Sequence, residues 1–169
     1  NAYSKALTSQ PDNPDALFGY GQMCYFIGDL QDAKESFQKS LDSNPKNSAA
    51  LSYLGKIAAE NENYTSAIKY IQEAIKYEGK NYDFHMDLGK YYQRINYPDK
   101  AIKEWETARD LDPTYFLAYA YLAGINDEHN NFEEALTNYR KVIETNPDYY
   151  YAYESAGIVE WHEGNWAES

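Results

Sequence analysis

Apolar residues recur along the chain at intervals of three and four, which is the spacing of one face of an α-helix. Two neighbouring stretches show the pattern clearly: Leu51, Leu54, Ile57 and Ala58, followed by Ala67, Ile71, Ala74 and Ile75. Followed from end to end, the pattern predicts two helical segments in each of several consecutive units. The first segments are expected at 14–27, 48–61, 82–95, 116–129 and 150–163. The second segments are expected at 30–43, 64–77, 98–111 and 132–145.

Short turns separate the two segments of each unit. They are Gly28-Asp29, Glu62-Asn63, Asn96-Tyr97, Asn130-Asn131 and Gly164-Asn165. Glycine and asparagine tolerate the left-handed conformation that ends a helix, and asparagine or aspartate then caps the helix that follows. The chain is therefore expected to form helix–turn–helix units along its whole length.

A strict period of 34 residues organises these units. Prolines at 11, 45, 113 and 147 are separated by 34, 68 and 34 residues, and Gly79 stands where the missing proline would fall. A period held this regularly indicates a repeat architecture. With Pro45 as position 32, the units start at residues 14, 48, 82, 116 and 150. The link at Gly79 is expected to be the most pliable.

Small and large residues occupy fixed columns of the repeat. Position 8 holds Gly21, Gly55, Gly89, Ala123 and Gly157, and position 24 holds Tyr3, Phe37, Ile71, Trp105 and Tyr139. Glycine inside a helix costs about 1 kcal/mol, so its recurrence at position 8 indicates that close helix packing is worth more. Position 24 is expected to fill the space between neighbouring units. On this interpretation, Trp105→Ala costs about 3–5 kcal/mol of stability through the cavity it leaves.

These columns resemble the tetratricopeptide repeat (TPR) family, whose 34-residue unit has small residues at positions 8, 20 and 27, an aromatic residue at 24 and proline at 32. The third unit shows the pattern as Leu88-Gly89, Tyr92, Ala101, Trp105, Ala108 and Pro113. The resemblance covers the whole chain. It implies an all-α fold, an α-solenoid of antiparallel helix pairs wound into a right-handed superhelix.

Departures from the family pattern are local. His85 takes the large apolar site at position 4, and Arg109 stands at position 28 where other units carry leucine or isoleucine. Position 11, usually tyrosine in the family, holds Cys24, Ala58, Asn126 and Glu160 in the other units. These residues are expected to alter packing locally, above all in the third unit, and to leave the fold intact.

The chain is expected to be one array, residues 1–169, that is cut in mid-unit at both ends. Residues 1–13 form a half repeat, residues 14–47, 48–81, 82–115 and 116–149 form full repeats, and residues 150–169 form a partial repeat. Because neither end resembles a polar capping repeat, the chain is interpreted as a piece of a longer array. Self-association through the exposed ends is the alternative.

Composition narrows the classes of function. With 43% hydrophobic and 17% aromatic residues, the chain has too much burial potential to be disordered. A net charge of −12 disfavours binding to nucleic acid and to anionic membranes, and no apolar run approaches the ~20 residues of a membrane span. Cys24 is the single cysteine, so no intrachain disulfide can form. Localisation stays open, with the cytoplasm slightly favoured and the periplasm as the alternative.

Signals for catalysis, metals and cofactors are weak. The stretch Gly19-Tyr20-Gly21 begins like a phosphate-binding loop but lies inside a predicted helix with no strand before it. His85, His129 and His162 fall on different repeat positions, and no metal-binding spacing such as HExxH or CxxC occurs. We therefore expect a protein that is not an enzyme and that needs no cofactor or metal.

The family resemblance implies a groove on the concave side, where the first helices of successive units face an extended or helical peptide. Positions 2, 5, 6, 9, 12 and 13 of the family commonly contact such a ligand. The candidate groove residues are Phe18, Gln22, Tyr53, Lys56, Asp87, Lys90, Arg94, Tyr121, Tyr151 and Glu154. The same positions also hold Tyr25, Phe26 and Glu60, of which the two aromatic residues are alternatively interpreted as packing between repeats.

The leading hypothesis is a TPR scaffold for protein–protein interaction that binds a peptide or protein segment with apolar or aromatic anchors. Lys56, Lys90 and Arg94 are expected to pair with acidic groups of that ligand. The clamp with which some TPR proteins hold a chaperone tail does not occur here, so that class of partner is disfavoured. Two alternatives stay open: a regulatory or substrate-recruiting part of a larger enzyme, and a self-assembling protein.

Overall fold

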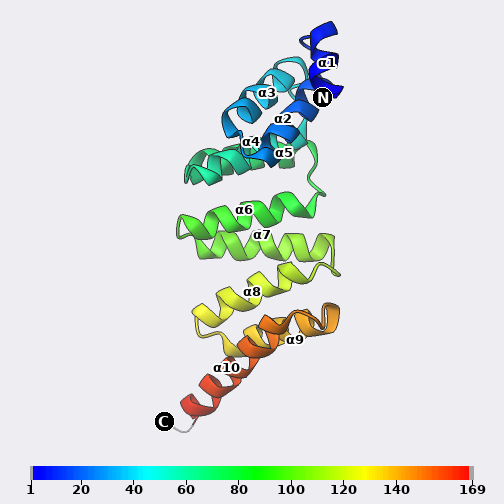
Figure 1. Cartoon of the computed structure of the whole chain (residues 1–169). Coiled ribbons are helices and arrows are strands. Elements are labelled where there is room, and N and C mark those ends of the chain that lie inside the picture. The colour runs from blue at the N-terminus through cyan, green and yellow to red at the C-terminus, as the bar shows by residue number, and fades with distance from the viewer. Residues whose placement is uncertain (1, 168–169) are drawn as a thin grey trace.

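The computed structural model describes residues 2–167, except for the side chains of residues 2, 4, 6 and 165–167. Helices and short connections make up this part of the chain, which contains no strand (Figure 1). The helices are α1 (Ala2–Ser9), α2 (Pro14–Ile27), α3 (Leu30–Ser43), α4 (Ser48–Glu60), α5 (Tyr64–Tyr77), α6 (Tyr82–Arg94), α7 (Pro98–Leu111), α8 (Phe116–Glu128), α9 (Phe132–Thr145) and α10 (Tyr150–Ala167). The expected all-α solenoid is confirmed.

The helix boundaries follow the sequence pattern closely. The bounds of α2, α3, α5, α7 and α9 are those predicted, while α4, α6 and α8 end one residue earlier than expected. Part of the reason is visible at the starts of α2 to α6, where a side-chain oxygen accepts from a backbone N–H of the first turn; α7, α8 and α9 have no such side-chain cap, so the expected cap at Asn131 is not formed. The Asn13 Oδ1 atom accepts from the Ala16 N–H at 2.9 Å and the Asn47 Oδ1 atom from the Ala50 N–H at 3.0 Å.

The last helix corrects one expectation. A turn was predicted at Gly164-Asn165, but α10 continues through both residues to Ala167. In the preceding units the equivalent turn is followed by a second helix that packs back on the first. No such helix packs against α10 within residues 2–167, and each added helical residue gains a backbone hydrogen bond, so the helix propagates past the turn signal.

Four turns within the units adopt the left-handed conformation that the sequence indicates. Gly28, Asn96 and Asn130 have φ angles of 86°, 61° and 60°. Glu62 stands at the same place in the second unit and has a φ angle of 57°. Glutamate is unfavourable in this conformation, because it lacks the steric freedom of glycine and the short polar side chain with which asparagine can form a local hydrogen bond. The backbone of the repeat therefore overrides the preference of this side chain.

Close packing between positions 8 and 24 holds the two helices of a unit together. A Cβ atom on Gly21 would lie 2.8 Å from the Phe37 ring, and one on Gly55 would lie 3.1 Å from Ile71. In the third unit the Trp105 indole lies against Gly89 and is fully buried. The glycines of the first three full units are thus needed for close approach, as the sequence predicts, whereas a Cβ atom on Gly157 of α10 would have no neighbour within 4 Å.

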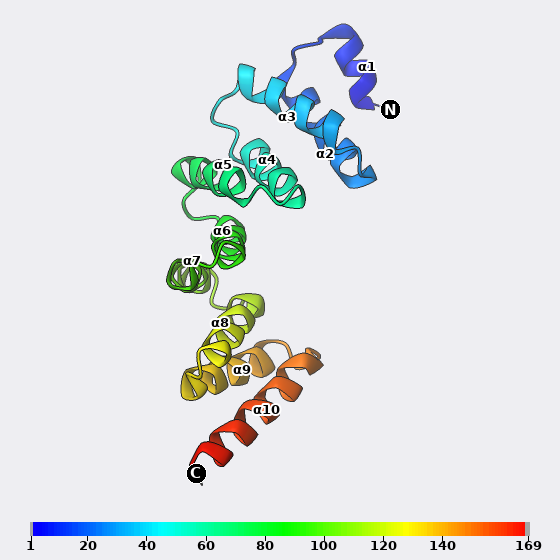
Figure 2. The same cartoon turned by 90° about the vertical axis from the view of Figure 1, so that its left-hand side faces the viewer.

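Position 24 also links each unit to the next. The Phe37 ring stacks on Tyr53 with centroids 4.9 Å apart, and Trp105 stacks on Tyr121 at the same separation. Buried residues from Cys24 to Ile125 form one continuous cluster, and a second cluster runs from Ala123 to Val159. Successive helix pairs are rotated relative to one another, so that α6 and α7 are seen end-on in Figure 2 while α10 runs across the view.

The third unit accommodates its unusual residues by pairing them. His85 is buried at position 4, where its Nδ1 atom lies 2.7 Å from the Glu104 carboxylate and its Nε2 atom 3.2 Å from the Gly79 carbonyl oxygen. Arg109 turns outward and pairs with Asp110 at 2.9 Å. The expected local change in packing is therefore a set of polar contacts, His85 with Glu104 and with the Gly79 carbonyl, which connects α6 to α7 and to the segment before α6. We call this set the His85 bracket.

Candidate functional site

A hollow of about 400 Å³ lies on the face formed by the first helices, and we call it the inner hollow. Helices α4 and α6 supply most of its lining, with one residue each from α2, α5 and α8. Its lining residues are Tyr25, Lys56, Ala59, Glu60, Tyr64, Asp87, Lys90, Tyr91, Gln93, Arg94 and Tyr121. The sequence spacing explains the arrangement, because Lys56, Ala59 and Glu60 lie on one side of α4 at helical spacing.

Two lysines converge on one carboxylate inside the inner hollow. The Lys56 Nζ atom lies 3.7 Å from Asp87 Oδ2, and the Lys90 Nζ atom lies 3.2 Å from Asp87 Oδ1. Asp87 is 13% exposed, whereas the lysine side chains are 39% and 37% exposed. The two ammonium groups therefore remain accessible from solvent while the carboxylate is largely covered.

Each lysine also lies over a tyrosine ring. The Nζ atom of Lys56 is 5.6 Å from the centroid of Tyr53, and that of Lys90 is 5.6 Å from the centroid of Tyr121. Such cation–π contacts orient the ammonium group and leave its remaining donors free. Burial opposes the charged form of Lys90, but the neighbouring Asp87 carboxylate and tyrosines raise its pKa above the ordinary value, so the amine stays protonated.

The balance of charge in the inner hollow is opposite to that of the chain. Lys56, Lys90 and Arg94 face two carboxylates, Asp87 and Glu60, which leaves one net positive charge in a chain of net charge −12. Arg94 is exposed and makes no ion pair among the residues that the structure describes. The Glu60 carboxylate already accepts a hydrogen bond from the Tyr25 hydroxyl at 2.6 Å. Within the described part of the chain, the charged group of the hollow that has neither an ion-pair nor a hydrogen-bond partner is therefore a cation, Arg94.

An aromatic cluster continues the site toward the N-terminal end of the array. Tyr53 is at its centre, with the Phe18 ring at 6.0 Å and the Tyr25 ring at 5.2 Å. The Gln22 amide donates a hydrogen bond to the Tyr53 hydroxyl at 3.2 Å. Phe26 extends the cluster into solvent, where most of its surface is exposed. This cluster is partly packing between repeats and partly an apolar surface beside the cationic hollow.

The predicted site residues thus fall into three groups. Lys56, Asp87, Lys90, Arg94 and Tyr121 come together in the inner hollow. Phe18, Gln22 and Tyr53 belong to the adjoining aromatic cluster. Tyr151 and Glu154 are exposed on α10, and neither lines the inner hollow.

Two tyrosines of the lining lie outside the positions from which the candidates were taken. Tyr91 and Tyr64 stand at positions 10 and 17, outside the positions that the family resemblance marks for ligand contact. Tyr91 is buried, and its burial together with nearby Asp87 raises the pKa of its hydroxyl. The ring pair Tyr64 and Tyr91, 6.3 Å apart, closes one wall of the hollow. To predict these two residues from the sequence, one would need both their repeat positions and the knowledge of which side of α6 faces the hollow.

Three further features of the described residues bear on metal sites, thiol chemistry and membrane spans. Among the described residues, no cluster of three or more histidine, cysteine, aspartate or glutamate side chains could hold a metal ion. Cys24 is buried, and burial raises the pKa of its thiol, so the reactive thiolate is disfavoured. A search of the same residues finds no helix long and apolar enough to cross a membrane.

The helix pairs, the glycine columns and the hollow on one face define a helical-repeat scaffold. A family model for the tetratricopeptide repeat matches residues 25–84 and 127–169, and the chain belongs to this family. Its relatives include Tetratricopeptide repeat protein 6 of Homo sapiens, which is 25% identical over 157 residues, 93% of this chain and 30% of that protein. The chain thus spans less than a third of this relative.

Solved structures with the same fold include MamA and YrrB. The crystal structure of MamA protein covers 91% of this chain and 84% of its own, with a TM-score of 0.82 and 23% identity. YrrB, described as a TPR protein with an unusual peptide-binding site, covers 98% of this chain and 85% of its own, with a TM-score of 0.82 and 19% identity. These likenesses show that the chain shares the fold of both proteins.

Proposed function

We propose that the chain is a non-enzymatic scaffold that binds an acidic, aromatic peptide or protein segment in the inner hollow and across the adjoining aromatic cluster. The observation that carries the proposal is the cationic hollow on an acidic chain. The chain as a whole carries a net negative charge, but here two lysines and Arg94 present accessible donors. Electrostatic complementarity of this kind selects partners and orients them.

Asp87 indicates which ligand group the lysines fit. Its carboxylate already bridges Lys56 and Lys90, so a carboxylate is the kind of group that their spacing suits. A ligand carboxylate would bind at the solvent side of the same pair, since both ammonium groups carry three donors and Asp87 uses few of them. Arg94 adds a planar fork that matches a second carboxylate.

The aromatic cluster supplies the apolar part of the surface. Phe26 is largely exposed beside Tyr25 and Tyr53, and exposed aromatic residues are enriched where proteins bind each other. A segment that combines carboxylates with aromatic or apolar anchors would use both parts of the face. YrrB, which shares the fold, is described as having a peptide-binding site.

The proposal is tested with a labelled peptide of alternating glutamate and tyrosine and with its glutamine counterpart. Fluorescence anisotropy gives the affinity of each for the chain and for the variant Lys56→Ala/Lys90→Ala/Arg94→Ala. We expect the acidic peptide to lose at least about tenfold in affinity, which corresponds to about 1.4 kcal/mol. The glutamine peptide should bind weakly to both proteins.

The matched control removes three cations from the second helices, in the variant Lys39→Ala/Lys69→Ala/Lys103→Ala. These lysines are exposed and do not line the inner hollow. The control changes the net charge by the same amount, so it reports the non-specific electrostatic contribution. Equal affinity losses in the two triple variants would refute the proposed site.

A further inference from the structure

In the third unit, the side chain at position 11 of the repeat lies between two consecutive second helices, α5 and α7. There Tyr92 projects from α6 and is buried, with the Gln72 amide of α5 donating to its hydroxyl at 3.0 Å. On the other side, the Lys100 Nζ atom of α7 lies 5.3 Å from the ring centroid. The tyrosine ring therefore occupies the space between α5 and α7.

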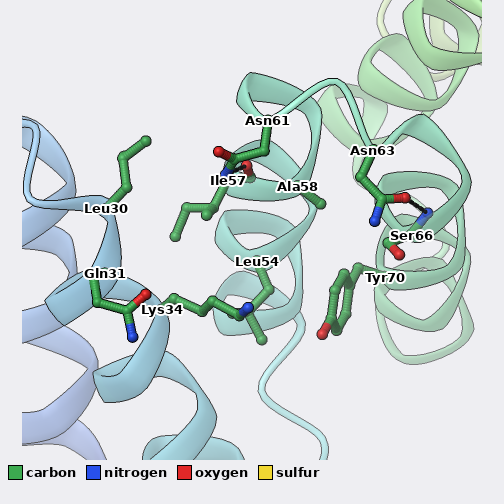
Figure 3. Close-up of a pocket in the computed structure, with 10 residues that line it drawn as sticks. All are labelled: Leu30, Gln31, Lys34, Leu54, Ile57, Ala58, Asn61, Asn63, Ser66 and Tyr70. Atoms are coloured by element: carbon green, nitrogen blue, oxygen red, sulfur yellow. Dashed lines mark hydrogen bonds between the residues drawn. The ribbon is translucent and has the colours of Figure 1, made fainter.

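One repeat earlier the same position is Ala58, and a pocket of about 510 Å³ opens there between α3 and α5 (Figure 3). We call it the outer pocket. It is lined by Leu30, Gln31, Lys34, Leu54, Ile57, Ala58, Asn61, Asn63, Ser66 and Tyr70. The repeat frame explains the space, because Lys34 stands where the next unit has Ile68 and Ser66 where it has Lys100. A methyl group in place of a phenol leaves room for an aromatic ring.

The outer pocket and the inner hollow use opposite sides of α4. Leu54, Ile57, Ala58 and Asn61 follow at helical spacing and face the outer pocket, whereas Lys56, Ala59 and Glu60 face the hollow. Occupants of the two sites would therefore not compete directly. The outer pocket is a separate feature of the molecule.

Its lining combines an apolar floor with a polar rim. Leu54 and Ile57 are buried and form the floor. In Figure 3 the Lys34 side chain reaches from α3 toward Leu54, and Asn61 stands at the end of the pocket near Ile57. Lys34 is the charged side chain of the lining, and it forms no ion pair among the described residues. An oxygen on an otherwise apolar ring would meet a donor there.

We propose that the outer pocket binds a tyrosine side chain that a partner protein presents. Tyr92 is a template within the chain, because it shows that a phenol fits between consecutive second helices and that its hydroxyl accepts a hydrogen bond from a side-chain donor there. The apolar floor accepts the ring, and the ammonium group of Lys34 suits the phenolic oxygen. Phenylalanine would offer Lys34 no acceptor, which favours tyrosine.

The probe is p-cresol, the side chain of tyrosine in isolation, titrated into the chain and followed by the backbone amide signals in two-dimensional NMR. We expect saturable shifts at residues 54, 57, 58 and 61, and weaker binding of toluene, which lacks the hydroxyl. Absence of saturable shifts at these amides would overturn the proposal. Shifts confined to the inner hollow would overturn it as well.

Two variants exchange the occupants of position 11. Ala58→Tyr places the chain's own ring in the outer pocket and should lower the affinity for p-cresol at least tenfold. Ala58→Met, a more adaptable filler, gives the same test should the tyrosine variant fold poorly. Tyr92→Ala should create an equivalent pocket between α5 and α7, with a new set of shifts at residues 88, 91 and 92. Unchanged p-cresol binding in both position-58 variants contradicts the proposal.

Discussion

At the scale of single residues, the contact between positions 8 and 24 decides how closely the two helices of a unit approach. Gly89 lies directly under the Trp105 indole, which is fully buried and stacked on Tyr121, so the ring has no space into which it could move. Gly124, at position 9 of the next unit, has no neighbouring atom within 4 Å of a Cβ. The same residue type therefore serves packing at one site and only weakens the helix at the other.

This difference predicts opposite effects of one substitution. Gly89→Ala should lower the free energy of unfolding by about 1–3 kcal/mol through overpacking against Trp105. Gly124→Ala should raise it by about 0.5–1 kcal/mol, because alanine favours the helix and meets no neighbour. Denaturant unfolding measures both. Two changes of the same sign would contradict the packing described for position 8.

The hydrogen-bond partners of His85 determine the protonation state of its ring. Both of its partners, the Glu104 carboxylate and the Gly79 carbonyl, are acceptors, so both ring nitrogens must donate, as in the imidazolium. The hydrogen bond to Glu104 raises the pKa of His85 above its ordinary value in spite of burial. The bracket is thus strongest when the ring is protonated.

The consequence is a defined pH dependence of stability. A raised folded-state pKa contributes stability that is fully present below the unfolded value of about 6.5 and is lost as the pH rises through the folded-state value. Denaturant unfolding at pH 6 and pH 8.5 should show this loss in the chain, and His85→Leu should remove it. Subtracting the variant cancels the background of carboxylates. Equal pH dependence in both proteins would exclude the bracket as its source.

At the scale of elements, the turn between the helices of a unit is set by the repeat more than by its residue. Glu62 adopts a left-handed φ of 57° in the place where other units have glycine or asparagine. For an L-residue this conformation costs about 1–2 kcal/mol. The neighbouring helices α4 and α5 pack well enough to impose it.

Relieving that strain should stabilise the second unit. Glu62→Gly is expected to raise the free energy of unfolding by about 0.5–1 kcal/mol, since part of the gain is offset by the larger entropy of glycine in the unfolded chain. Glu62→Ala is the control, because it removes the side chain but keeps the strained backbone. Thermal or denaturant unfolding that shows an equal gain for alanine would rule out backbone strain as the cause.

The helices were predictable because period, caps and turn residues all indicate the same boundaries. The failure at Gly164-Asn165 shows the limit of that reasoning: a turn residue ends a helix when a second helix packs back, and α10 has none among the described residues.

The candidate site was predictable in part. The repeat positions were enough to name Lys56, Lys90 and Arg94 as candidates. The ion pairs of Asp87 with two lysines and the place of Tyr91 in the wall depend on distances between neighbouring repeats, which the period of the sequence does not give.

At the scale of the whole molecule, the distribution of charge separates one face from the rest. The chain carries a net charge of −12, yet the inner hollow holds three cations and two carboxylates. Asp87 forms ion pairs with both lysines, so it would compete with the proposed acidic ligand for them. On this proposal, the same carboxylate contributes to the stability of the array and lowers the affinity for the ligand.

Asp87→Asn should shift that balance. Without the internal carboxylate, Lys56 and Lys90 become fully available, so affinity for the acidic peptide should rise severalfold. Stability should fall by about 0–1 kcal/mol, as expected for loss of partly exposed ion pairs. Calorimetric titration and thermal unfolding of the same sample measure both quantities. A fall in affinity would mean that Asp87 acts mainly by positioning the lysines.

The most direct test of the account is to locate the acidic, tyrosine-containing peptide on the chain by amide and lysine side-chain shifts in NMR. We expect saturable changes at Lys56, Lys90, Arg94 and Tyr121, on the face formed by α4, α6 and α8. These changes should vanish in the Lys56→Ala/Lys90→Ala/Arg94→Ala variant. Saturable changes confined to the second helices or to α10, with the inner hollow unaffected, would contradict it.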